Sequence, residues 1–92
     1  MASSGGAKYQ TNALAAVEDI TPTVSPMTIQ NTSIFTQDVL ISGGTVTTIA
    51  YSRNGSDFYT VGLTSGVVQL SPGDYCKVTY AVSPTALKRI YR

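Results

Sequence analysis

Few residues of this chain could carry acid–base, nucleophilic or metal chemistry. Histidine, the side chain that most often serves as a general base or metal ligand, is absent. No closely spaced acidic loop predicts a calcium site, since the acids are scattered as Glu18, Asp19, Asp38, Asp57 and Asp74. No motif places a serine beside Lys8, Lys77 or Lys88, and no glycine-rich phosphate loop precedes a helix. We therefore predict no catalytic, metal or cofactor-binding residue, and a protein that is not an enzyme.

The single cysteine, Cys76, cannot form a disulfide within the chain. It shares one face of an alternating run with Val78, Tyr80 and Val82, so we expect a buried thiol on the core face of a strand. The N-terminal sequence MASSGGAKYQ has no apolar signal segment, and no stretch approaches the length of a membrane span. We therefore expect neither secretion through an oxidising compartment nor a membrane partner.

The elements that must position any functional residue are predicted to be strands. From Val46 to Tyr80, apolar and hydroxyl-bearing residues alternate, and the alternation is interrupted by turn residues. We expect seven short strands, at residues 27–31, 35–41, 46–53, 58–63, 67–70, 75–82 and 87–91. The pattern predicts an all-β protein, a small antiparallel β-sandwich that is either immunoglobulin-like or jelly-roll-like.

The turns between these strands have recognisable residues. Asn54-Gly55 favours a two-residue hairpin loop with Tyr51 opposite Phe58, whereas a four-residue loop would place Arg53 opposite Phe58. Proline and glycine at the second and third positions of residues 71–74 predict a type II turn. Gly43-Gly44 predicts a further turn. Asn31-Thr32-Ser33 and Asn54-Gly55-Ser56 match the glycosylation sequon, but without a secretion signal we interpret them as loop residues.

The first 26 residues differ in composition from the rest. Residues 1–6 are small, and residues 21–26 (TPTVSP) favour an extended chain because each proline restricts its own φ and disfavours helix at the preceding residue. We therefore divide the chain into an extended N-terminal arm at residues 1–26 and a β-sandwich domain at residues 27–92.

The surface chemistry points to protein partners. Charged residues make up 12% of the chain and the net charge is +1. The 10 serines and 13 threonines supply most of the polarity, so we infer a surface partly covered by neighbours; the alternative is a threonine-rich soluble sandwich. No basic stripe with interleaved aromatic residues predicts nucleic-acid binding.

Two groups of residues are candidates for contacts. Lys88 and Arg89, with Arg92, form a basic cluster that either meets an acidic partner or is a solvated tail. Tyrosine combines apolar area with a polar tip and is enriched at interfaces. The candidate subunit contacts are Tyr9, Tyr75, Tyr91, Lys88 and Arg89.

The segments IAYSRNGSDFYTVGLT (49–64), VQLSPGD (68–74) and VTY (78–80) together resemble small β-sandwich virion proteins of tailed bacteriophages. These are capsid decoration (cement) proteins and head-fibre or tail-appendage modules. The resemblance implies a non-enzymatic decoration protein on the phage head, made in the host cytoplasm, that contacts the major capsid protein and copies of itself as a homotrimer. The alternative is a tail, fibre or adhesion module that binds a host-surface ligand through an exposed loop containing Arg53 and Asn54.

Overall fold

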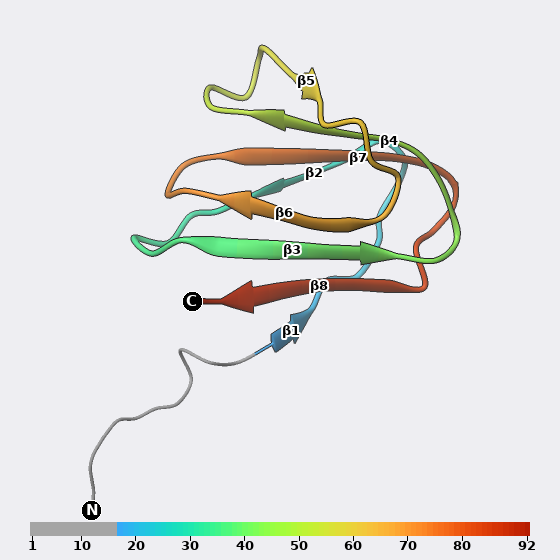
Figure 1. Ribbon diagram of the computed structural model, residues 1–92, viewed down its shortest axis with the longest axis horizontal. Helices are drawn as coiled ribbons and strands as arrows, with labels where there is room; N and C mark the ends of the chain where they lie inside the picture. The colour runs from blue at the N-terminus through green and yellow to red at the C-terminus, as the bar shows by residue number, and fades with distance from the viewer. Residues whose placement is uncertain (1–16) are drawn as a thin grey trace, which may run out of the picture.

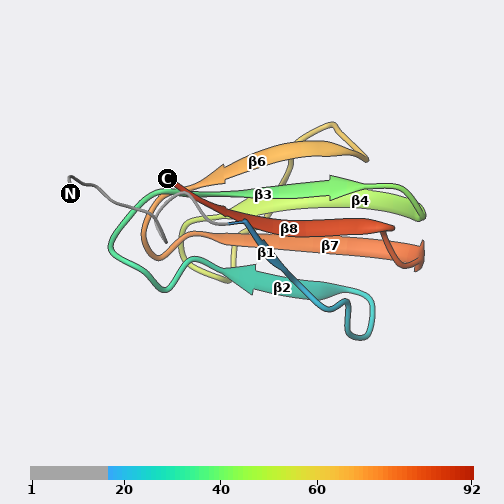
Figure 2. The same ribbon diagram turned by 90° about the horizontal axis from the view of Figure 1, so that it is seen from below.

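The computed structural model describes residues 17–92, and in this part of the chain all regular structure is β. The strands are β1 (Val17–Asp19), β2 (Met27–Gln30), β3 (Gln37–Ser42), β4 (Thr45–Ser52), β5 (Tyr59–Thr60), β6 (Gly66–Leu70), β7 (Tyr75–Val82) and β8 (Ala86–Tyr91). They form two antiparallel four-stranded sheets (Figures 1 and 2). The predicted all-β sandwich is therefore confirmed.

The strand order distinguishes between the two sandwich types left open by the sequence. Sheet A has the order β1-β8-β3-β6 and sheet B the order β2-β7-β4-β5. The pairs β1–β8, β2–β7, β3–β6 and β4–β5 show that the first half of the chain folds back along the second half. This nested pairing of eight strands across two sheets is the topology of a jelly roll.

The core lies between the inner faces of the two sheets. It contains the buried apolar side chains Met27, Ile29, Val39, Ile41, Ile49, Val68, Leu70, Cys76, Val78 and Leu87. These residues recur at every second position because alternate side chains of a strand point to opposite faces. Burial of Cys76 and Val78 on β7 confirms the expected core face of that strand, and Tyr80 packs partly against the core. Val82 is different: at the end of β7 it is 58% exposed, so its expected core position is wrong.

The strand at residues 58–63 is much shorter than expected, and both predicted registers of its hairpin are wrong. The structure pairs Tyr51 with Tyr59, and a wide loop of residues 53–58 separates β4 from β5. Ser52 Oγ accepts hydrogen bonds from the backbone N–H groups of Asn54 (3.2 Å) and Gly55 (2.9 Å). Asn54 Oδ1 accepts from the N–H groups of Ser56 and Asp57. These local bonds stabilise the wide loop in place of a two-residue turn.

The other two predicted turns are present. The N–H of Asp74 donates to the carbonyl oxygen of Ser71 at 2.9 Å and Gly73 has φ +88°, as a type II turn requires. Gly43 and Gly44 have φ +80° and +66°, and their turn connects β3 in sheet A to β4 in sheet B.

The segment before β2 contacts both sheets. β1, which the sequence pattern did not predict, pairs with β8 at the edge of sheet A. The chain then crosses to sheet B, where the Tyr80 hydroxyl donates to the carbonyl oxygen of Thr23 and the N–H of Tyr80 donates to Ser25 Oγ (2.8 Å). Residues 17–26 of the segment named an arm therefore lie along the sandwich. The division at residue 26 stays a prediction, because residues 1–16 lie outside the described part.

Candidate functional site

Three connections lie together at one end of the sandwich (Figure 1). They follow β2, β4 and β6, and comprise residues 31–36, 53–58 and 71–74; we call them the loop end. Two of the candidate contact residues named from sequence, Arg53 and Asn54, belong to it, and Tyr75 directly follows it. The loop end is therefore the first surface to consider.

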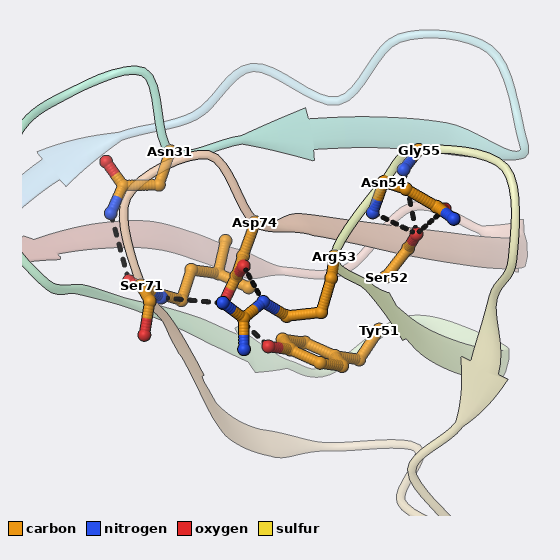
Figure 3. Close-up of polar contacts among 9 residues, drawn as sticks. Asn31, Tyr51, Ser52, Arg53, Asn54, Gly55, Ser71 and Asp74 are labelled. Atoms are coloured by element: carbon orange, nitrogen blue, oxygen red, sulfur yellow. Dashed lines mark hydrogen bonds and ion pairs between the residues drawn. The ribbon is translucent and has the colours of Figure 1, made fainter.

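A buried carboxylate organises the loop end (Figure 3). Asp74 Oδ2 accepts hydrogen bonds from the Tyr51 hydroxyl at 2.6 Å and from the backbone N–H of Ser71 at 2.9 Å. Asp74 Oδ1 forms an ion pair with Arg53 Nε at 2.9 Å. The hydrogen bond to Asp74, followed by burial, raises the pKa of the Tyr51 hydroxyl above its usual 10.0. The carboxylate thus joins the β4 strand end to the turn before β7.

Asn31 is the second organising side chain, and it is fully buried. Its Nδ2 donates to the carbonyl oxygens of Phe35 (2.8 Å) and Leu70 (2.9 Å). Its Oδ1 accepts from the backbone N–H (3.0 Å) and the hydroxyl (2.7 Å) of Ser33. The sequon at Asn31 therefore contains a structural asparagine whose amide is used inside the fold.

These bonds leave two adjacent apolar side chains exposed on a loop that is held by internal hydrogen bonds. Ile34 is 82% and Phe35 is 51% exposed. Ser33 Oγ accepts from the N–H of Phe35 (3.2 Å). We call Ile34 and Phe35 the apolar tip. Because hydrogen bonds within the chain already hold this loop in one conformation, ordering it on binding would cost little entropy.

The apolar tip was not predicted from the sequence, in which Phe35 begins an expected strand. In the sequence, two large apolar residues directly follow the polar, turn-forming residues Asn31-Thr32-Ser33. This pattern was the signal that could have identified the tip.

Arg53, Asn54 and Tyr75 each have a contact within the chain. The Arg53 side chain is 74% exposed although its Nε is paired with Asp74. Asn54 Nδ2 donates to Asp57 Oδ2 at 2.9 Å, so both ends of its amide bond within its own loop. The Tyr75 ring lies against Gly55, where an added Cβ would be 3.0 Å from Cζ. The structure thus brings these three residues together; Arg53 and Asn54 are exposed, and Tyr75 is partly buried.

The other candidate residues lie where β8 meets β1. Lys88 forms an ion pair with Asp19, and the Tyr91 hydroxyl donates to Glu18 Oε1 at 2.6 Å, which raises the pKa of Tyr91. Arg89 Nη1 donates to Gln37 Oε1 (3.2 Å), and its Nε lies 3.9 Å from Glu18 Oε1. These side chains therefore contact β1 of their own chain.

Two residues named from the sequence, Arg92 and Tyr9, do not lie at the contact between β8 and β1. Arg92 Nε donates to Asp38 Oδ2 at 2.9 Å. Tyr9 lies outside the described residues.

Within residues 17–92, no group of three or more His, Cys, Asp or Glu side chains is placed to hold a metal ion. The same residues contain no helix of the length and hydropathy needed to cross a membrane. The Cys76 thiol is buried, and burial raises its pKa to about 12. A thiol with such a pKa is poorly nucleophilic at neutral pH, so Cys76 has a packing role.

No protein-family model, no curated protein and no solved structure matches this chain. The apolar tip and the loop end that supports it are therefore interpreted from their own geometry.

Proposed function

We propose that the chain is a non-enzymatic structural protein of a tailed-bacteriophage virion, a decoration protein that binds the major capsid protein on the head surface. The observation that carries the proposal is the apolar tip. Two exposed apolar side chains on a loop held by Asn31 and Ser33 form a small, pre-ordered anchor. Such an anchor suits binding to a preformed site on a large, repetitive surface.

The fold is compatible with this role but does not assign it. Jelly rolls occur in viral capsid and lectin domains, and one architecture serves many functions. The apolar tip is therefore the feature whose removal should change binding to the head.

The experiment measures binding of the purified full chain to phage heads that lack it, by co-sedimentation. Replacing Ile34 and Phe35 together by serine should weaken binding at least about tenfold, because each buried side chain contributes roughly 1.5–3 kcal/mol. The control is Val82→Ser, which removes an exposed apolar side chain from the last residue of β7, a strand whose first residue follows the loop end. Equal binding of the tip variant and the unmodified chain would refute the proposal.

A truncated chain tests the contribution expected from the arm. The truncation must stop at residue 16, because Val17–Asp19 forms β1 and pairs with β8. We propose that the arm embraces a neighbouring subunit, so a chain that begins at Val17 should lose capsid binding while its unfolding transition is retained. If the truncated chain still binds the phage heads, the binding is due to the tip and does not need the arm.

One observation favours a second candidate function, binding of a host-surface ligand by a tail or fibre module. Arg53 exposes 74% of its side chain at the loop end, beside the loop of Asn54. Under this alternative, Arg53→Ala reduces adsorption of phage to host cells and leaves particle stability unchanged. A loss of particle stability alone would eliminate it.

A further inference from the structure

β6 is an outer strand of sheet A, and its partner strand is β3 on one side only. Figure 2 shows it along one rim of the sandwich. Its five residues pair with β3 in continuous register, from Leu70 opposite Gln37 to Gly66 opposite Ile41. An outer strand presents unpaired backbone N–H and C=O groups, and soluble proteins usually protect such an edge.

Each of the other three outer strands has a feature that hinders pairing with another chain. β1 carries the charges of Glu18 and Asp19, β2 begins directly after Pro26, and β5 is two residues long. Charge, proline and shortness are the usual protective features of sheet edges. β6, with the sequence GVVQL, has no charge and no proline, so within residues 17–92 it is the outer strand best suited to accept another strand.

The chain segment that contains β6 is apolar and uncharged. Val67, at the second position of β6, is 48% exposed, and β5 with the connection that follows it exposes Tyr59, Val61 and Leu63. Residues 58–73 contain no Lys, Arg, Asp or Glu. Asp38, which lies opposite Gln69 on β3, is paired with Arg92, so an identical copy meets no unpaired charge of the described residues next to β6.

We infer that β6 is a self-association edge, on which β6 of a second copy of this chain pairs antiparallel about a twofold axis. With the axis at Val68, the middle residue of the strand, Val67 lies opposite Gln69 of the second copy. Both side chains are exposed, whereas Val68 points into the core. The pairing joins two copies of sheet A into one continuous sheet.

The symmetry of this contact predicts the number of copies. A twofold contact uses the same patch on both chains and closes at two, so the product is a dimer and not the homotrimer that the family resemblance implies. A contact built on five residues lies below the standard interface of about 1,600 Å², so we expect a weak dimer. The inference does not depend on binding to a phage head.

Sedimentation equilibrium of the full chain, up to about 1 mM, tests the inference. We expect a monomer–dimer equilibrium, and Val67→Lys should raise the dissociation constant at least about tenfold because the substitution places a charge on the edge of each copy. The control Val24→Lys alters a side chain that is 81% exposed in the segment before β2, and it should leave the equilibrium unchanged. A monomer at all concentrations, a trimer, or a dimer that Val67→Lys does not weaken would overturn the inference.

A double variant tests the register. In Val67→Cys with Gln69→Cys, each new thiol should face its counterpart on the second copy, because side chains opposite one another in antiparallel strands have Cβ atoms about 4.5–5.5 Å apart. Mild oxidation should give a covalent dimer, whereas Val24→Cys should not. Absence of a covalent dimer from the double variant would overturn the stated register and, with sedimentation as a monomer, the pairing itself.

Discussion

The backbone N–H of Asn31 donates to the carbonyl oxygen of Asp74 at 3.0 Å, and this bond continues the β2–β7 ladder by one residue into the loop end. The N–H of Gly73 donates in return to the carbonyl oxygen of Asn31 at 2.8 Å. The Asn31 side chain also donates to Leu70 at the end of β6, and the Asp74 side chain bonds Tyr51 and Arg53 at the end of β4. Asn31 and Asp74 together therefore connect the three segments of the loop end and support the apolar tip.

Replacement of Asp74 by alanine should lower the free energy of unfolding by about 2–3 kcal/mol, because Tyr51 and the N–H of Ser71 lose a charged acceptor. Urea denaturation measures this loss. The matched control is Asp57→Ala, since Asp57 is exposed and its carboxylate bonds only the Asn54 amide among the described residues; its effect should stay within about 0.5 kcal/mol. Similar losses for the two variants would contradict the central role of Asp74.

Two glycines with positive φ should respond differently to alanine. At Gly73 (φ +88°) an added Cβ meets nothing within 4 Å, so Gly73→Ala should cost only the strain of the left-handed conformation, about 1–2 kcal/mol. At Gly44 (φ +66°) the Cβ would lie 2.1 Å from the carbonyl oxygen of Ser83. Gly44→Ala should therefore destabilise more than Gly73→Ala in thermal unfolding. The reverse order would mean that the β3–β4 turn does not pack against the β7–β8 connection.

The buried thiol predicts a loss of stability at alkaline pH. Burial raises the pKa of Cys76 from 9.0 to about 12, so the unfolded chain releases this proton first. The stabilising contribution is complete below pH 9 and is lost as the pH rises towards 12. Relative to Cys76→Ala, the unmodified protein should lose about 2 kcal/mol between pH ~8 and ~11. A pH-independent difference between the two proteins in urea denaturation would argue against burial of the thiol.

Replacement of Tyr80 by phenylalanine should loosen the segment between β1 and β2. The hydroxyl of Tyr80 donates to the carbonyl oxygen of Thr23, and removal of this bond should cost about 1 kcal/mol. Amide hydrogen exchange in residues 20–26 should become faster. Tyr59→Phe, which alters an exposed side chain, serves as the control; equal exchange in the two variants would contradict the prediction.

Sequence reasoning succeeded where the determinants are local. The type II turn depends on Pro72 and Gly73, whose backbone preferences act on their own residues. The core face of β7 follows from the alternation of Cys76 and Val78. The register of the Asn54-Gly55 hairpin was predicted wrongly, because the Ser52 and Asn54 side chains compete with the strand ladder for backbone N–H groups.

β1 was not predicted from the sequence, because its position also depends on contacts with other segments. Its three residues are all exposed, so no apolar alternation marks them as a strand. They pair with β8 and interact with Lys88 and Tyr91, which are about 70 residues away in the chain.

By itself, the sequence determined that this protein is an all-β sandwich with a buried cysteine and identifiable turns, because alternation and turn preferences act over a few residues. Only the tertiary structure decided the jelly-roll order, the burial of Asn31 and Asp74 and the exposure of Ile34 and Phe35. The physical reason is that these features depend on which distant segments meet. The hydrogen bond from Asn31 to the carbonyl oxygen of Leu70 joins residues 39 positions apart, and no local preference specifies such a partner.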